Sequence, residues 1–192
     1  MARANFIKSA NKPIYRNGKQ ITKVHESGKD KGQQYNIVDK HQPADESDTI
    51  LINVGESYYW WKFRYGSKIF SKFAPKPSQL TQNPFYSTLY DIQDEIDCLS
   101  PDDSIVDNLE TIKSSIEELR DEQQEKMDNM PESLQGNCDS YNILEERHDA
   151  LDEWYSELDS IDVEVDESLS EDEQQERYDE ILEEIQGTSC GV

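Results

Sequence analysis

Hydrophobic residues in the second half of the chain recur at alternating steps of four and three. The first series comprises Phe85, Leu89, Ile92, Ile96 and Leu99. A stripe at this spacing is typical of an amphipathic helix whose apolar face packs on a neighbour. Asn83 followed by Pro84 predicts the N-cap and the first helical position. The pattern therefore predicts a helix that begins at Pro84.

Three further series follow after residues 100–103, which interrupt the pattern. The second comprises Ile105, Leu109, Ile112, Ile116 and Leu119, and continues in phase through Gln123 and Lys126 to Met130. The third comprises Leu144, His148, Leu151, Tyr155 and Leu158. The last comprises Tyr178, Ile181, Leu182 and Ile185, and Ser170 and Glu173 before it have the spacing of a capping box. Because short connections favour antiparallel neighbours, residues 79–187 are predicted to form an acidic antiparallel helical coiled coil or bundle, with a tail over 188–192.

The first half of the chain contains short runs of β-branched and aromatic residues instead. Runs over 49–54, 57–64 and 68–73 predict a small aromatic antiparallel three-stranded sheet within a module spanning 45–78. A two-residue loop at Gly66-Ser67 pairs Tyr65 with Lys68, Phe63 with Phe70 and Trp61 with Lys72. A turn one residue longer changes this register.

Residues 1–44 have scattered apolar residues among lysines, glycines and polar side chains. This composition favours a basic flexible arm. Asn17-Gly18 leaves open a short hairpin between 14–15 and 21–24. The predicted fold class is therefore α+β, in the order arm, sheet and acidic helices.

Charge is divided unevenly along the 192 residues, whose 42 acidic and 19 basic residues give a net charge of −23. Residues 1–90 hold 14 basic and 7 acidic residues, a net of +7, whereas residues 91–192 hold 5 and 35, a net of −30. Such asymmetry indicates interaction partners rather than a fold. Either each half has its own partner, or the basic half docks on the acidic half within or between chains.

The chain has no run of about 18 apolar residues, so we expect no membrane span. The start, MARANFIKSANK, lacks the continuous apolar stretch of a secretory signal. Three well-separated cysteines form neither a CxxC motif nor an even disulfide set, which fits a reducing compartment. We therefore expect a cytoplasmic protein.

Side chains suited to catalysis are few. The candidates are Cys98, Cys138, Cys190, His25, His41 and His148. His148 lies on a helical face, where Glu145 or Asp152 is the expected partner. The motifs GxxxxGK[ST], GxGxxG, HExxH and GxSxG are absent. We expect no enzyme and no cofactor.

One segment, 162–173, has the spacing of a calcium loop, with acids at positions 1, 3, 5 and 12 and an aliphatic residue at 8. Position 6 of that loop requires a positive φ and hence glycine, but Glu167 stands there. Acidic residues are so frequent in this half that the other matches are expected by chance. We therefore predict no metal site.

A nucleic-acid interface is predicted on the aromatic sheet. Its residues are Tyr58, Trp60, Lys62, Arg64, Lys68 and Lys72. Cations of this kind bind phosphates, and aromatic rings stack on bases. The alternative is that the rings pack against Phe85, Tyr86 and Tyr90 of the following helix. The sequence YYWWKFRYGSKIFSK (58–72) resembles the three-stranded arm-binding modules of tyrosine integrases, which implies a sheet that enters a DNA groove.

The acidic helices offer a second surface, for a protein partner. The expected residues are Glu117, Glu118, Asp121, Glu122 and Glu125. Ordered carboxylates of this density reproduce the field of DNA phosphates, which predicts a DNA mimic that occupies a host enzyme. The alternatives are a solvated face of a structural coiled coil and a homo-oligomer formed through the helices.

Five stretches carry a further resemblance: MARANF, PADESD, GESYYWWKFRYG, SK-x-x-P-x-P-SQLTQ and LYDIQDEI. Together they resemble an uncharacterised group of phage-associated proteins with an acidic helical C-terminal half. The resemblance implies a viral context, a host or phage protein as partner and action in the host cytoplasm. We therefore expect a non-enzymatic phage accessory protein that acts by macromolecular binding.

Overall fold

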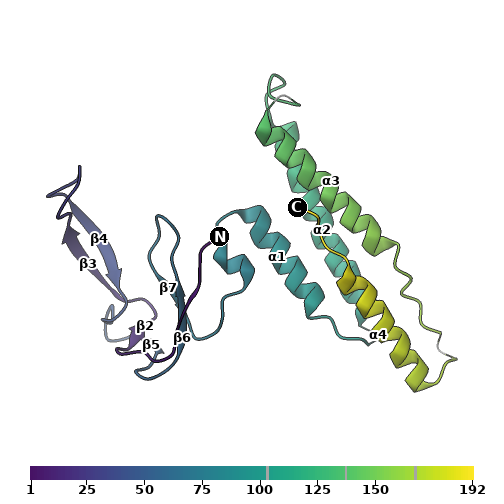
Figure 1. The fold of residues 1–192 in the computed structure, drawn as a ribbon, viewed down its shortest axis with the longest axis horizontal. Helices are drawn as coiled ribbons and strands as arrows, with labels where there is room; N and C mark the ends of the chain where they lie inside the picture. The colour runs from purple at the N-terminus through teal and green to yellow at the C-terminus, as the bar shows by residue number, and fades with distance from the viewer. Residues whose placement is uncertain (103, 137, 167) are drawn as a thin grey trace. The chain divides into compact units, whose positions relative to one another are not determined.

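The chain divides into two compact units, Met1–Asn83 and Pro84–Val192 (Figure 1). This computed structural model describes residues 1–102, 104–136, 138–166 and 168–192. The strands described lie in the first unit, here called the strand unit, and the α-helices lie in the second, the helical unit. The fold class is α+β, as predicted.

Small antiparallel sheets make up the strand unit. Its elements are β1 (Asn5–Ile7), β2 (Ile14–Tyr15), β3 (Lys19–Val24), β4 (Gln34–Asp39), β5 (Ile50–Ile52), β6 (Tyr58–Trp61), β7 (Ile69–Ser71) and the short 3-10 helix η1 (Pro77–Leu80). The described sheets have the orders β1-β6-β7, β2-β5 and β3-β4.

The three-stranded sheet differs from the predicted one in its third strand and its register. β6 and β7 pair as predicted, but β1 supplies the third strand and β5 pairs with β2. Trp60 faces Phe70 and Trp61 faces Ile69, so the connection spans 62–68 and the pairs predicted around Gly66-Ser67 do not form. This register buries Trp61, which is 4% exposed, and places the charged residues of 62–68 outside the sheet.

Residues 1–44, predicted as a flexible arm, contain β1 to β4. β1 and β2 pair with strands beyond residue 44, so 1–44 is not separate from the sheet module. The hairpin considered across Asn17-Gly18 does not form, because β2 pairs with β5 and β3 pairs with β4. Ile14 and Ile52 are fully buried and form a small core with Ala10.

One carboxylate fixes the turn between β2 and β3. Asp48 accepts hydrogen bonds from the N–H groups of Asn17, Gly18 and Ala44, at 3.0, 2.8 and 2.9 Å. Partial desolvation raises the pKa of Asp48, but these donors outweigh it, and the pKa lies below its ordinary value. Gly18 has φ +73°, and a Cβ there would lie 2.8 Å from the Asp39 carbonyl oxygen, so the turn requires glycine.

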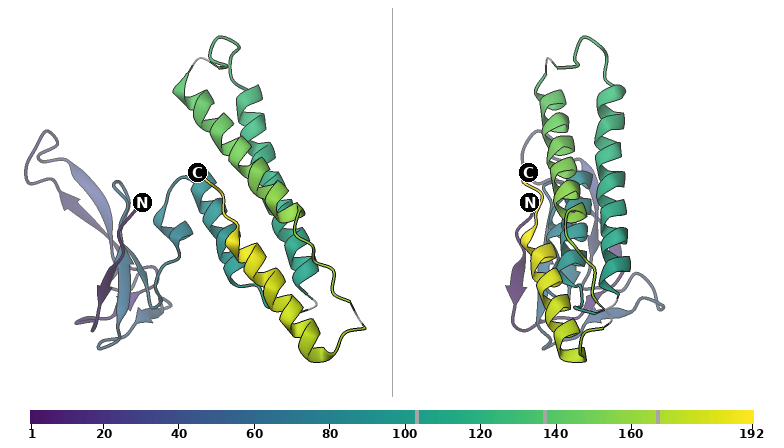
Figure 2. Two further views of the ribbon diagram at one scale, coloured as in Figure 1. Left: turned by 45° about the vertical axis from the view of Figure 1, so that its right-hand side comes forward. Right: turned by 90° about the vertical axis from the view of Figure 1, so that its right-hand side faces the viewer.

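Helices α1 (Pro84–Asp97), α2 (Ile105–Asp128), α3 (Asp139–Asp159) and α4 (Glu171–Gly187) make up the described part of the helical unit. α2 and α3 lie side by side and antiparallel (Figure 2). Ion pairs join them from Lys113 to Asp159 and from Arg120 to Asp152, at 3.0 and 2.9 Å. One apolar core takes side chains from all four helices. As predicted, α1 begins at Pro84, and the capping box precedes α4.

The buried residues differ from the predicted apolar series by one position at two points. Met127 is buried at the end of α2, whereas Lys126 is exposed and Met130 half-buried. On α3, Trp154 is buried and Tyr155 half-buried. At the end of α2 the cause is the helical repeat of 3.6 residues, which departs from a strict alternation of four and three. Trp154 lies three residues after the buried Leu151 and four before the buried Leu158, so it belongs to the same apolar stripe as the predicted series.

None of the helices in the described ranges combines the length and the apolar composition that crossing a membrane requires.

Candidate functional site

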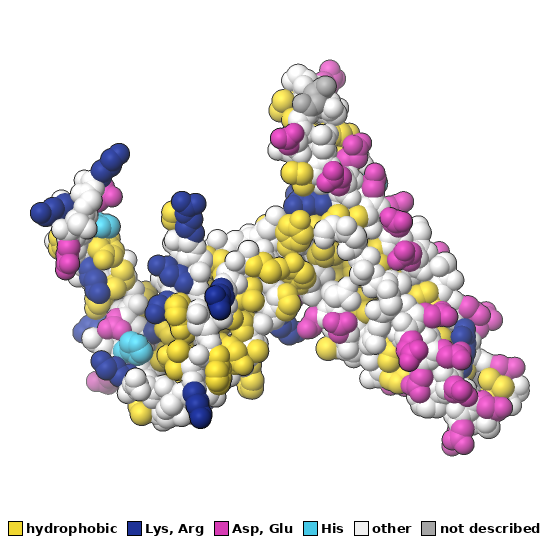
Figure 3. Space-filling model, in the orientation of Figure 1, with side chains coloured by type: hydrophobic (Ala, Val, Ile, Leu, Met, Phe, Trp, Pro, Cys, Tyr) yellow, Lys and Arg dark blue, Asp and Glu magenta, His cyan; other side chains and the backbone are white. Residues whose placement is uncertain are grey.

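The boundary after Asn83 also separates the charge of the chain. The strand unit holds all 14 basic and 7 acidic residues that precede it, and the helical unit holds 5 basic and 35 acidic residues. Figure 3 shows Lys and Arg side chains scattered over the strands, and Asp and Glu side chains over the helices. The strand unit therefore has a net charge of +7 and the helical unit −30.

A cationic stretch without acidic residues runs from 57 to 90. Its basic residues are Lys62, Arg64, Lys68, Lys72 and Lys76. The connection between β6 and β7, residues 62–68, carries the first three; we call it the β6–β7 loop. All three are exposed. Three of the 14 basic residues of the strand unit thus lie in one seven-residue loop that contains no acidic residue.

Aromatic rings accompany the cations of the β6–β7 loop. The Arg64 guanidinium carbon lies 5.3 Å from the ring centroid of Tyr65, and the Lys68 Nζ lies 4.0 Å from that of Trp60. The Tyr65 side chain is 90% exposed. Two cation–π pairs therefore involve residues of this loop: Arg64 with Tyr65, and Lys68 with Trp60 of β6.

Two of the six predicted interface residues make contacts within the strand unit. Tyr58 is half-buried and packs on Phe70, with ring centroids 6.0 Å apart. Lys72 pairs with Glu56 at 2.9 Å. Hydrogen bonds from Lys72 and Asn53 lower the pKa of Glu56 to about 2. The other four residues lie in the β6–β7 loop or, in the case of Trp60, against it.

The predicted acidic row on α2 is exposed throughout. It comprises Glu117, Glu118, Asp121, Glu122 and Glu125. Arg120 lies 3.2 Å from Glu117 and 3.6 Å from Asp121, and Lys126 lies 2.8 Å from Glu122. The other two carboxylates have no basic group within ion-pair distance in the described parts of the chain. Neighbouring cations on α2 thus neutralise part of this row.

A groove of about 440 Å³ lies between α1 and α2. The exposed carboxylates that line it are Asp91, Glu95, Glu118 and Glu122. The buried Ile92 and Leu119 also line it. The groove therefore combines an apolar surface with a negative field from both helices.

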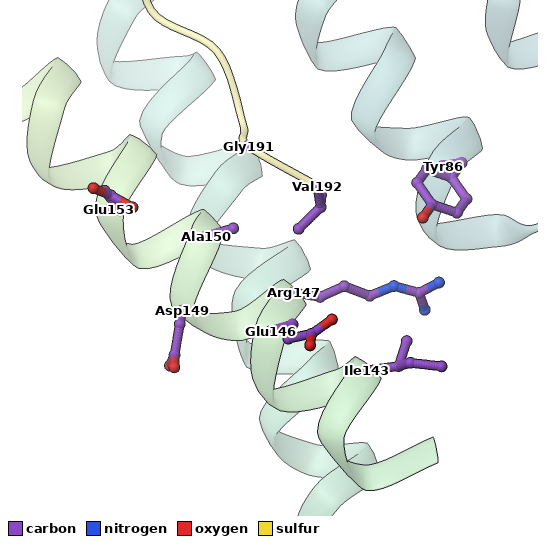
Figure 4. Close-up of a pocket in the computed structure, with 9 residues that line it drawn as sticks. All are labelled: Tyr86, Ile143, Glu146, Arg147, Asp149, Ala150, Glu153, Gly191 and Val192. Atoms are coloured by element: carbon purple, nitrogen blue, oxygen red, sulfur yellow. The ribbon is translucent and has the colours of Figure 1, made fainter. Parts of the chain in front are cut away.

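A second hollow, of about 600 Å³, lies beside α3 (Figure 4). Arg147 extends from α3 toward Tyr86, and its guanidinium carbon lies 4.4 and 5.1 Å from the ring centroids of Phe85 and Tyr86. Glu146 and Glu153 line the same hollow. Its lining includes no histidine, cysteine or serine. Arg147 is thus held by aromatic rings, while the other basic residues of the helical unit pair with carboxylates.

The three cysteines of the candidate catalytic set lie in different settings. Cys98 is exposed just beyond α1. The Cys138 Sγ accepts a hydrogen bond from the Tyr141 N–H at 3.4 Å and caps α3. Cys190 packs against the core of the helical unit, and burial raises the pKa of its thiol. Cys138 and Cys190 thus make contacts within the helical unit, whereas Cys98 is exposed.

The histidines also make local contacts. The ring of His25 lies 4.3 Å from that of Tyr35, and the His41 Nδ1 lies 3.1 Å from the Pro13 carbonyl oxygen. The His148 Nδ1 lies 3.1 Å from Asp149, a partner on the neighbouring position instead of the expected Glu145 or Asp152.

Within the described ranges, no three His, Cys, Asp or Glu side chains lie close enough to hold a metal ion. In the segment with calcium-loop spacing, Asp162 and Asp166 accept hydrogen bonds from nearby backbone N–H groups. Glu173 accepts a hydrogen bond from the N–H of Ser170, the N-cap of α4. Glu167, the residue at position 6, lies outside the described residues.

The chain matches no protein-family model, no curated protein and no solved structure.

Proposed function

We propose that this protein is a non-enzymatic phage accessory protein that binds nucleic acid through the β6–β7 loop. One observation carries the proposal: three exposed cations and the exposed ring of Tyr65 occupy one loop, within a stretch of the chain that has no acidic residue. Cations neutralise phosphates whatever the base sequence, and rings add stacking on bases. The resemblance to phage-associated proteins supports action in the cytoplasm of an infected host cell.

The charge of the helical unit makes this binding local. The Debye length is about 8 Å at physiological ionic strength, so carboxylates farther than this from a bound phosphate repel it only weakly. The strand unit has a net charge of +7 and attracts phosphate by itself. Nucleic acid therefore contacts the strand unit and avoids the helices.

Neutralising the β6–β7 loop tests the proposal. In the full chain, the triple change Lys62→Ala, Arg64→Ala and Lys68→Ala should weaken nucleic-acid binding by about tenfold or more, because three phosphate contacts are lost. Fluorescence anisotropy with a labelled oligonucleotide at low salt measures the affinity.

A matched control removes the same charge from the exposed β3–β4 hairpin, by Lys23→Ala, Lys29→Ala and Lys31→Ala. The control should bind almost as tightly as the unchanged protein. Equal losses in the two triple variants would contradict the assignment to the β6–β7 loop. Failure of the unchanged chain to bind at low salt would contradict the function itself.

A second candidate function belongs to the helical unit: an acidic surface that occupies the DNA-binding site of a host or phage protein. The groove between α1 and α2 favours it, because four carboxylates surround an apolar surface that a basic protein segment fits. The 24-residue α2 is about 36 Å long, a length over which B-DNA carries on the order of 20 phosphate charges. α2 alone holds 8 acidic and 3 basic residues, a net of −5, so a charge of that order requires the carboxylates of the other helices, which bring the net charge of the unit to −30.

The groove carboxylates are tested by the change Asp91→Asn, Glu95→Gln, Glu118→Gln and Glu122→Gln. This variant should fail to retain a DNA-binding protein from host lysate, and added duplex DNA should release that protein from the unchanged chain. The matched control, Asp179→Asn with Glu176→Gln, Glu183→Gln and Glu184→Gln on α4, removes four exposed charges and should retain it. If the protein is retained and added duplex DNA does not release it, this result would favour a purely structural helical module.

A further inference from the structure

We infer that the nucleic acid bound by the β6–β7 loop is single-stranded and that its bases stack on Tyr65. This inference rests on the proposed function and specifies the substrate of the same loop.

Tyr65 is the most exposed large ring of the strand unit. Its side chain is 90% exposed, although burying an aromatic side chain lowers the free energy of the protein. The ring lies in a connection between strands, where no core residue requires it. An exposed ring of this size offers a ligand a flat apolar surface.

The ring lies beside the cations that a nucleic-acid backbone requires. The guanidinium of Arg64 is 5.3 Å from the Tyr65 ring centroid, and Lys68 stands 4.0 Å above the half-buried Trp60 ring. Lys62 and the two ring-bound cations have no carboxylate within ion-pair distance among the residues that the structure describes. Phosphate groups therefore meet three cations that carboxylates do not neutralise.

The other basic hairpin of the strand unit lacks this combination. Glu26 and Asp30 lie in the connection between β3 and β4 among its lysines, and the Tyr35 ring contacts the His25 ring at a centroid distance of 4.3 Å. Local carboxylates weaken its field, and its ring already has a partner. The chemistry of the β6–β7 loop is therefore distinct within the unit.

Stacking on an exposed ring discriminates single strands from duplexes. In a duplex the faces of each base are covered by the neighbouring base pairs, and only the edges are presented in the grooves. In a single strand every base has a free face, and aromatic side chains bind it with little regard to sequence. The exposed Tyr65 ring beside Arg64 therefore fits an unpaired strand.

The experiment compares three labelled probes of about 12 nucleotides with the full chain at low salt: oligothymidylate, a duplex, and an abasic strand with the same number of phosphates. Oligothymidylate should bind most tightly. Tyr65→Ala should weaken it by about 5- to 150-fold and leave the abasic strand unaffected, since only base stacking is lost. Tyr65→Phe keeps the ring and should bind as the unchanged protein does.

Phe73→Ala is the matched control, because Phe73 is 80% exposed in the strand unit but lies outside the β6–β7 loop. It should bind oligothymidylate with unchanged affinity. A duplex bound as tightly as oligothymidylate, or a Tyr65→Ala variant of full affinity, would overturn the inference and leave the proposed function intact. The absence of binding to all three probes would overturn both.

Discussion

Replacing Trp154 by alanine should lower the free energy of unfolding of the helical unit by about 3–5 kcal/mol. Trp154 is 1% exposed and belongs to the core shared by the four helices. Its Nε1 donates a hydrogen bond to the Thr188 Oγ1 at 2.9 Å, and that hydroxyl donates to the Ile185 carbonyl oxygen at 2.9 Å. The side chain therefore fills the core and fastens the end of α4 to α3. Urea unfolding followed by far-ultraviolet circular dichroism measures the loss.

Two variants separate these contributions. Thr188→Val removes the hydroxyl partner and should cost about 1–3 kcal/mol, because the buried indole N–H is left without an acceptor. Tyr155→Ala changes a neighbouring aromatic residue of α3 that is only half-buried, and should cost less than Trp154→Ala. An equal cost at positions 154 and 155 would contradict the core assignment.

Replacing Gln123 by methionine should raise the free energy of unfolding, by about 1–3 kcal/mol. Gln123 is fully buried in α2, and its Nε2 donates to the Leu119 carbonyl oxygen at 3.0 Å. Its Oε1 is buried and has no hydrogen-bond partner among the residues the structure describes. Methionine has a similar shape and removes an acceptor that has lost its water. The same urea experiment measures the gain.

Gln124→Met provides the control, because Gln124 is the exposed neighbour on the same helix. Its effect should lie within about 0.5 kcal/mol of zero. A destabilised Gln123→Met variant would show that the buried amide oxygen makes a favourable interaction, and would contradict this account of the α2 core.

Features of the fold that depend on residues close together in the chain are predictable from the sequence. The start of α1 at Pro84 and the capping box before α4 depend on residues within one helical turn. The apolar series identified most core residues of the helices. The series does not include Trp154, because positions three and four residues after Leu151 share one helical face and the spacing alone does not choose between Trp154 and Tyr155.

Strand pairing in the first unit depends on distant residues and was harder to predict. β1 pairs with β6 across more than fifty residues, and no pattern within Asn5–Ile7 indicates that partner. The register of β6 and β7 follows from the burial of Trp61 and not from the Gly66-Ser67 turn signal. A three-residue error in register moves every pair along the hairpin.

The sequence indicates the cations of the interface but not the exposure of Tyr65, which depends on the register of β6 and β7. Residue type alone identified Lys62, Arg64 and Lys68, since the density of cations does not depend on pairing. The turn signal at Gly66-Ser67 predicts a strand pair between Tyr65 and Lys68, whereas the structure places Tyr65 in an exposed loop. The absence of acidic residues from 57 to 90 was the available signal for this loop.

The salt dependence of single-strand binding tests the central claim most directly. If three cations of the β6–β7 loop neutralise phosphates, the logarithm of the affinity of the full chain for oligothymidylate should fall with the logarithm of salt concentration with a slope of about −2. The triple variant Lys62→Ala, Arg64→Ala and Lys68→Ala should reduce that slope almost to zero. The same slope in both proteins would contradict the claim that this loop binds nucleic acid.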